Sequence, residues 1–167
     1  MYASTVTSAI PERHLDAWRG VLNAHASVVA DVGAALAAAE LPPLAWYDVL
    51  WAIRRAPARR MRMAELAASL TISRGGLTKV ADRLESAGLM RREPAADDGR
   101  GLYAALTAEG DTMLRRMWPV YARALRETFV SAITSEEAAV IADALGRVSD
   151  RERQPMPKSG GRDRRRS

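Results

Sequence analysis

The sequence predicts a mainly α-helical fold with one small β-hairpin, and three patterns indicate it. Apolar residues recur every three or four positions near both ends of the 167-residue chain, which is typical of amphipathic helices. A short helix, a turn and a second helix are indicated between residues 63 and 87. Two short extended runs then flank a charged turn at 94–101, as in a hairpin. Together they predict a winged helix-turn-helix flanked by long helices.

The predicted helix-turn-helix is defined by its turn and its ends. The first helix carries Leu66 and Leu70 on one face. The turn at 71–73 ends in Ser73, whose hydroxyl can accept a hydrogen bond from an exposed N–H of the second helix. Gly88 should end that helix, because glycine readily adopts positive φ. The expected buried side of the second helix consists of Leu77, Val80, Ala81 and Leu84.

Two helices are expected before this motif. The first should run from about residue 11 to 40, because seven residues recur at alternating steps of three and four, a heptad-like seam that must pack against another helix. Pro42 and Pro43 end it. The second, at about 45–55, is apolar nearly all round, so it should be central and buried. Residues 60–62 predict a very short strand against the wing. The seam consists of Leu15, Trp18, Leu22, His25, Val29, Val32 and Leu36.

Two helices are also expected after the hairpin, whose strands should lie near 89–92 and 102–106. One should run over about 108–131, with a kink at Pro119. The segment 134–137, Thr-Ser-Glu-Glu, matches a capping box and should open a last helix that ends near Val148.

Positive charge is concentrated around the predicted helix-turn-helix. The net charge is +5, and residues 1–150 hold 18 basic and 18 acidic groups. Residues 54–100 alone hold 11 basic and 6 acidic groups, which is the charge distribution that a phosphate-binding surface needs. Taken alone, Arg54 to Arg60 could equally be an ordinary solvated surface.

Composition excludes several classes of protein. Without cysteine there are no disulfides and no thiolate metal sites, and two histidines do not make a zinc site. We expect neither a membrane span nor a signal peptide, and therefore a cytoplasmic protein. No nucleophile motif such as Gly-x-Ser-x-Gly occurs, so we expect no enzyme and no cofactor. Residues 1–10 should form a flexible leader and 151–167 a disordered basic tail.

The chain resembles the MarR family of bacterial transcriptional regulators. The resemblance implies one domain over 11–150, with dimerisation helices at about 11–40 and 108–150 and a winged helix-turn-helix at about 45–107. It also implies an obligate homodimer that reads a pseudo-palindromic duplex. The residues in the characteristic order of that family are Leu66-Ala67, Ser73, Thr78, Asp82-Arg83-Leu84-Glu85, Gly88-Leu89, Arg92, Pro94, Asp98-Gly99-Arg100, Leu106-Thr107 and Gly110.

The same resemblance implies how DNA would be bound. The second helix of the motif would enter the major groove, and Arg100, held by Asp98, would enter the adjacent minor groove. Without the family pattern, residues 97–99 could be a plain hairpin turn. Gly75-Gly76 departs from the family pattern. Either recognition of the DNA sequence relies more on other side chains, or the helix backbone approaches a phosphate closely at these glycines. The candidate DNA-binding residues are Ser73, Arg74, Thr78, Lys79, Arg83, Arg92, Asp98 and Arg100.

A small-molecule site is a further implication, because members of this family often release DNA when an aromatic or phenolic ligand binds between the dimer helices and the winged lobe. The protein would then be a ligand-released repressor, with Arg83 as a possible link between ligand and DNA. Simple core packing is the competing interpretation of the aromatic residues. A winged-helix module that binds a protein, with an incidental basic tail, is the competing function. The candidate ligand residues are His14, Trp18, His25, Trp46, Tyr47, Asp48 and Trp51.

Overall fold

The structure is a computed structural model that describes residues 10–70, 73–94 and 101–150. It divides into two compact units, Met1–Phe129 and Val130–Ser167. The expected single domain over 11–150 stays a prediction.

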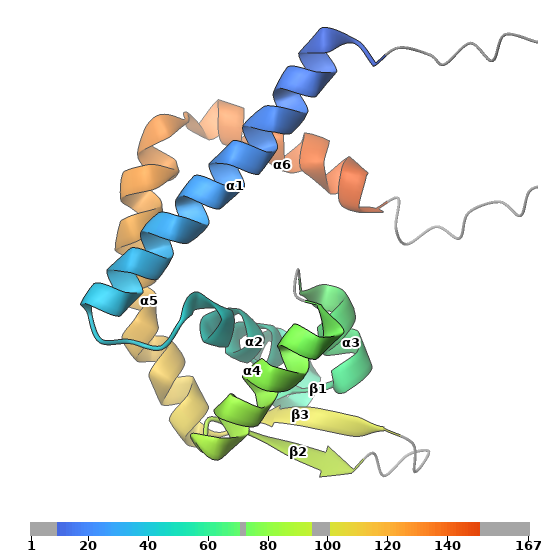
Figure 1. Cartoon of the computed structure of the whole chain (residues 1–167), viewed down its shortest axis with the longest axis vertical. Coiled ribbons are helices and arrows are strands. Elements are labelled where there is room, and N and C mark those ends of the chain that lie inside the picture. Colours follow the sequence, from blue (N-terminus) through green and yellow to red (C-terminus); the bar gives the residue numbers. More distant parts are fainter. Residues whose placement is uncertain (1–9, 71–72, 95–100, 151–167) are drawn as a thin grey trace, which may run out of the picture. The chain divides into compact units, whose positions relative to one another are not determined.

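The expected mainly α fold with a small sheet is confirmed (Figure 1). The strand at residues 60–62 is present as predicted. The helix expected over 108–131 ends at Thr128, and a short 3-10 turn follows at Val130–Ala132. The elements are α1 Glu12–Ala38, α2 Leu44–Arg55, a 3-10 turn Pro57–Arg59, β1 Arg60–Arg62, α3 Met63–Ser69, α4 Arg74–Ser86, β2 Met90–Pro94, β3 Leu102–Leu106, α5 Ala108–Thr128 and α6 Ser135–Asp150.

The three strands form an antiparallel sheet in the order β1-β3-β2. Met61 pairs with Ala104, and Arg62 pairs with Tyr103. Successive side chains of a strand point to opposite faces. One face therefore carries Met61 and the buried Ala104 toward the core, and the other carries Arg62 and Tyr103.

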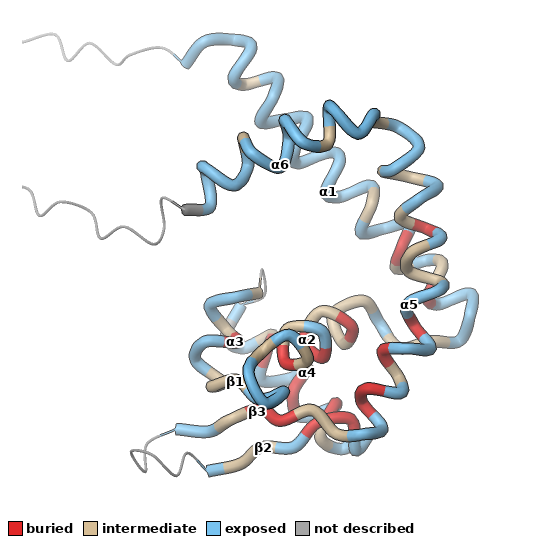
Figure 2. Tube along the Cα trace, turned by 180° about the vertical axis from the view of Figure 1, so that it is seen from behind, coloured by how far each residue is buried: buried red, intermediate tan, exposed pale blue. Residues whose placement is uncertain are grey.

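The core of the first unit gathers around α2 and the inner face of the sheet, as the buried residues in Figure 2 show. Val49, Leu50 and Ile53 of α2 are fully buried, as expected for a central helix. The expectation was only partly right, because Trp51 is 37% exposed. The other core side chains include Leu36, Leu66, Leu77, Leu84, Met90, Leu114 and Met117.

The turn from α4 into the wing is closed by local hydrogen bonds. Gly88 has φ +71°, as predicted for the residue that ends α4. The Leu89 N–H donates to the Leu84 carbonyl at 2.9 Å, the bond that a helix-ending glycine typically allows. The Thr107 hydroxyl donates to the Gly88 carbonyl at 2.8 Å and accepts from the Gly110 N–H at 3.0 Å. The base of the wing and the start of α5 are thereby fixed to one another.

The seam predicted on α1 is only partly covered within the chain. Val32 and Leu36 are buried in the core, whereas Trp18 and Leu22 remain 58% and 48% exposed. Contrary to expectation, α1 is long and apolar enough to cross a membrane by length and composition alone. A packing seam explains the same apolarity, because one end of it already lies in the core of the first unit.

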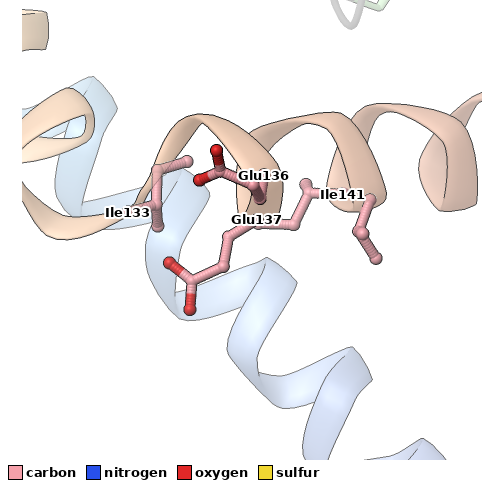
Figure 3. A pocket seen from close by; sticks show the side chains of 5 residues that line it. Ile133, Glu136, Glu137 and Ile141 are labelled. Atoms are coloured by element: carbon pink, nitrogen blue, oxygen red, sulfur yellow. The ribbon is translucent and has the colours of Figure 1, made fainter.

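The second unit contains α6. The Glu137 N–H donates to the Thr134 hydroxyl at 3.2 Å, and the Thr134 N–H donates to the Glu137 carboxylate at 2.8 Å. The predicted capping box is therefore confirmed. Beside it lies an open, mostly apolar groove (Figure 3). Its lining residues are Ile133, Glu136, Glu137, Val140 and Ile141.

Candidate functional site

Helix α4 presents a polar face away from the core. Leu77, Ala81 and Leu84 are buried, so the opposite side of the helix faces solvent. Ser73 caps this helix as predicted, because its hydroxyl accepts from the Gly76 N–H at 3.1 Å. The cap satisfies one of the donors at the helix N-terminus, where the dipole favours negative charge.

Three of the predicted contact residues lie on this polar face. Thr78, Lys79 and Arg83 are all exposed. Arg74 is the first residue of α4, and its side chain lies outside the described residues. A Cβ added to Gly75 would meet nothing within 4 Å, so the fold itself does not require a glycine there.

Arg92 is placed differently from the other predicted contacts. Its guanidinium donates to Asp82 at 2.7 Å and to Glu85 at 2.8 Å, and its side chain is only 20% exposed. The Arg92 backbone N–H also donates to Glu85 at 2.8 Å. Arg92 therefore fastens β2 to α4, and both carboxylates compete with any phosphate for its charge.

The predicted contacts at the wing tip fall within residues 95–100. Asp98 and Arg100, with the ion pair expected between them, lie outside the described residues. Gly101 follows directly, with φ +100°, a conformation that other residues rarely adopt.

A buried carboxylate joins the winged lobe to α5. The side chain of Asp111 is 8% exposed and lies 3.1 Å from Arg54, 3.6 Å from Arg59 and 2.5 Å from Arg115. A carboxylate of this kind needs paired cations, because an isolated buried charge is strongly unfavourable. The sequence offered only a weak signal for Asp111, namely an acidic residue in the first turn of α5.

The structure stacks four aromatic rings between α2 and α5. The ring centroids of Tyr47 and Tyr121 lie 4.7 Å apart, those of Trp51 and Trp118 lie 6.4 Å apart, and both pairs are nearly parallel. The Arg54 guanidinium lies 5.6 Å from the centroid of Trp51. Of the predicted ligand residues, Tyr47 and Trp51 belong to this stack, whereas Trp118 and Tyr121 were not among the candidates.

The pKa values of three groups at this stack are raised, by burial and by electrostatic repulsion among the groups. Burial first, then Tyr121 and Asp48, raise the pKa of Tyr47 to about 12. Burial, with the nearby Asp48, also raises the pKa of Tyr121. The pKa of Asp48 is raised by burial. A half-buried carboxyl group therefore lies close to two phenol groups, in surroundings that disfavour additional negative charge.

The remaining ligand candidates are not gathered at the stack. His14, Trp18 and His25 lie exposed on α1, and none of the ring contacts among the described residues involves Trp18. Trp46 is half-buried and packs against the core. The part of the chain that the structure describes contains no group of three or more histidine, aspartate or glutamate residues suited to a metal ion.

These features define a winged helix-turn-helix protein, and the comparisons with known proteins agree. The MarR family model matches residues 41–101. The chain is 32% identical over 103 residues to the HTH-type transcriptional regulator PecS of Dickeya dadantii, a match that covers 61% of each protein. It is 29% identical over 80 residues to the uncharacterized HTH-type transcriptional regulator YkoM of Bacillus subtilis, covering 48% of this chain and 52% of that protein. The matches thus span about half to three fifths of the length of these two relatives.

Solved structures extend the similarity over most of the chain. Sco3205 from Streptomyces coelicolor, a MarR family transcriptional regulator in complex with DNA, has a TM-score of 0.76 and 30% identity, covering 89% of this chain and 96% of that one. A mutant of MarR from E. coli complexed with operator DNA has a TM-score of 0.69 and 25% identity, covering 84% and 99%. The chain belongs to the MarR family.

Proposed function

We propose that this protein is a sequence-specific DNA-binding transcriptional regulator that acts in the cytoplasm as a homodimer. The observation that carries the proposal is the polar face of α4, with a capped N-terminus and the exposed side chains of Thr78, Lys79 and Arg83. A helix of this kind in a winged helix-turn-helix enters the major groove, where side chains can reach both bases and phosphates. The DNA complexes of Sco3205 and MarR support the same reading by similarity.

Arg92 is better assigned to positioning than to contact. Its two ion pairs hold β2 against α4, so Arg92 would set the angle between the wing and α4, the proposed recognition helix. In this proposal the direct contacts come from α4, with Arg100 of the wing still expected in the minor groove.

The proposed dimer follows from apolar surface that each chain leaves uncovered. On α1 the exposed seam includes Trp18, Leu22 and Val29. On α6, Val140, which lines the groove of the second unit, and Val148 are exposed. Apolar faces of this regularity are normally buried against another helix, and a second copy of the chain would supply one.

We further propose that the protein is a repressor released by a small phenolic ligand at the stack of Tyr47, Trp51, Trp118 and Tyr121. A half-buried Asp48 favours a neutral phenol, whose hydroxyl can donate to the carboxylate, over an aromatic carboxylate, which it would repel. Titration with phenol and with benzoate, followed by tryptophan fluorescence, tests this. Phenol should bind more tightly and weaken DNA binding. If the Trp118→Ala variant responds to both compounds as the parent protein does, this site is excluded.

The proposed regulator is tested by selecting duplexes from a random pool with the full-length protein. Enrichment of a pseudo-palindromic sequence is expected, because a two-fold dimer presents two identical reading helices. A retained pool without any common sequence would contradict specific recognition. Failure to retain duplex at low ionic strength would contradict DNA binding altogether.

A further inference from the structure

Three arginines from separate elements surround one buried carboxylate, and together we call them the Asp111 cluster. The cluster consists of Asp111, Arg54 of α2, Arg59 of the 3-10 turn and Arg115 of α5. Three guanidinium groups and one carboxylate carry a local charge of +2, and no other carboxylate of the described residues forms an ion pair with these arginines. The cluster therefore holds more positive charge than a buried carboxylate needs as compensation.

Two of the three guanidiniums lie near Asp111 without a hydrogen bond to it. Arg115 donates to Oδ2 at 2.5 Å. The Arg54 Nε lies 3.1 Å from Oδ1, yet Oδ1 has no hydrogen-bond partner, and Arg59 is 3.6 Å from Oδ2. A guanidinium has five N–H donors, and among the described residues the side chains of Arg54 and Arg59 form no hydrogen bond. Their donors are available to a further acceptor.

The turn that presents Arg59 is held in an unfavourable backbone conformation. Ala58 and Arg59 have φ of +52° and +53°, in the left-handed region that residues with a Cβ rarely adopt. Such strain persists where the surrounding structure or a function requires it. The ion pair of Arg59 with Asp111 is long, and the Arg59 side chain is well exposed, so that pair stabilises the turn little. The strained turn is thus a second observation that points to a ligand of Arg59.

We propose that the Asp111 cluster is a binding site for a small phosphate monoester. The site lies apart from the polar face of α4, so the inference goes beyond the proposed function. It also differs from the proposed phenol site, where Asp48 disfavours negative charge, because the Asp111 cluster attracts it.

A phosphate monoester fits the charge and the exposure of the cluster. Its charge at neutral pH is about −1.5 to −2, which offsets the local charge of +2. Arg59 and Arg115 approach the same oxygen of Asp111, so one phosphate group can reach both. Their side chains are each 59% exposed, whereas that of Asp111 is 8% exposed, so solvent reaches the cations and not the carboxylate. Planar guanidiniums bind phosphate through paired N–H donors.

The test is isothermal titration calorimetry of the full-length protein with methyl phosphate and with dimethyl phosphate, at fixed ionic strength and about pH 7.5. Methyl phosphate is a monoester that is mostly doubly charged there, whereas dimethyl phosphate carries a single charge. Methyl phosphate should bind at one saturable site per chain. Dimethyl phosphate should bind at least about tenfold more weakly, because it lacks the second charge.

Four variants locate the site. Arg59→Gln and Arg115→Gln, made separately, should each weaken methyl phosphate binding by about tenfold to a hundredfold, because each removes one charged donor. Arg59→Lys keeps the charge but not the paired donors, so its affinity should lie between those of the parent and Arg59→Gln. Arg123→Gln removes an exposed arginine farther along α5, and it should bind as the parent does. Thermal unfolding without phosphate shows whether each variant is folded.

Several results would overturn the inference. It fails if methyl phosphate shows no saturable binding, or if dimethyl phosphate binds equally well. It also fails if Arg59→Gln and Arg115→Gln bind as the parent does, or if Arg123→Gln loses as much affinity as they do. If the selected operator duplex displaces methyl phosphate, the cluster belongs to the DNA-binding surface and a small ester is not its partner. The titration itself uses no DNA, so its failure leaves the proposed regulator untouched.

Discussion

Replacement of Gly110 by alanine would place a methyl group against the backbone at the base of the wing. The added Cβ would lie 2.0 Å from the Leu89 carbonyl oxygen and 2.9 Å from Leu106. Ordinary contact begins at 3.4 Å, so the carbonyl must move by about 1.4 Å from the Cβ. That movement disturbs the bonds of Thr107 to Leu89 and Gly88. Overpacking costs about 1–3 kcal/mol and each weakened hydrogen bond about 1 kcal/mol.

Alanine recovers about 1 kcal/mol because it favours helix more than glycine does. The net loss for Gly110→Ala should therefore be about 2–4 kcal/mol, or a fall in Tm of about 4–16 °C for a chain of this size. Gly75→Ala is the matched control, since a Cβ there meets nothing within 4 Å, and it should be neutral or stabilising. Both are measured by thermal unfolding of the full chain at one fixed concentration. Equal midpoints for Gly110→Ala and the parent would refute the close contact.

Three other substitutions test separate parts of the account. Arg92→Met should reduce the free energy of unfolding by only about 1 kcal/mol, because Asp82 and Glu85 are partly exposed. It should leave the slope of log DNA affinity against log salt unchanged. A slope lower by about one per lobe would show that Arg92 contacts a phosphate after all. Stability should fall between pH 10 and about 12, because Tyr47 ionises near 10.0 when unfolded and near 12 when folded, so the unfolded state loses its proton first. Tyr47→Phe should reduce the fall of the unfolding free energy between pH 10 and about 12. The same fall in the variant and the parent would contradict this role of Tyr47. Leu22→Arg should yield monomers in analytical ultracentrifugation, since it buries a charge in the proposed dimer seam; a stable dimer would count against that interface.

Local sequence signals predicted much of the fold. Ser73, Gly88 and the box of Thr134 with Glu137 act through hydrogen bonds to residues a few positions away. Such short-range chemistry can be recognised from spacing alone. For the same reason the elements were placed within a few residues of their observed ends.

The roles of particular side chains were harder to predict, because their partners are distant in the sequence. Arg92 matched a family position and was assigned to DNA, but its partners Asp82 and Glu85 are brought to it by the turn at Gly88. Trp118 gains its place in the aromatic stack only because α5 packs beside α2, about 70 residues away in sequence. Its spacing of three from Tyr121 was the one available signal.

The α1 candidates depend on a partner that the sequence does not identify. Trp18 and His25 fall on a regular seam, and aromatic or polar residues on such a seam can serve packing as well as a ligand. Trp18 is 58% exposed in the single chain, so in the proposed dimer the partner helix would decide what covers it. The seam pattern predicts that α1 packs against another helix, but the pattern does not identify that helix.

The most direct measurement of the central claim is fluorescence anisotropy of the full-length protein with the selected operator and with a scrambled duplex, over a series of salt concentrations. We predict operator binding at least about a thousandfold tighter than binding to the scrambled duplex near physiological salt. Log affinity for both should fall linearly with log salt, because the proposed phosphate contacts of Lys79 and Arg83 would release counterions from the DNA. Equal affinity for the two duplexes, or affinity independent of salt, would contradict the account.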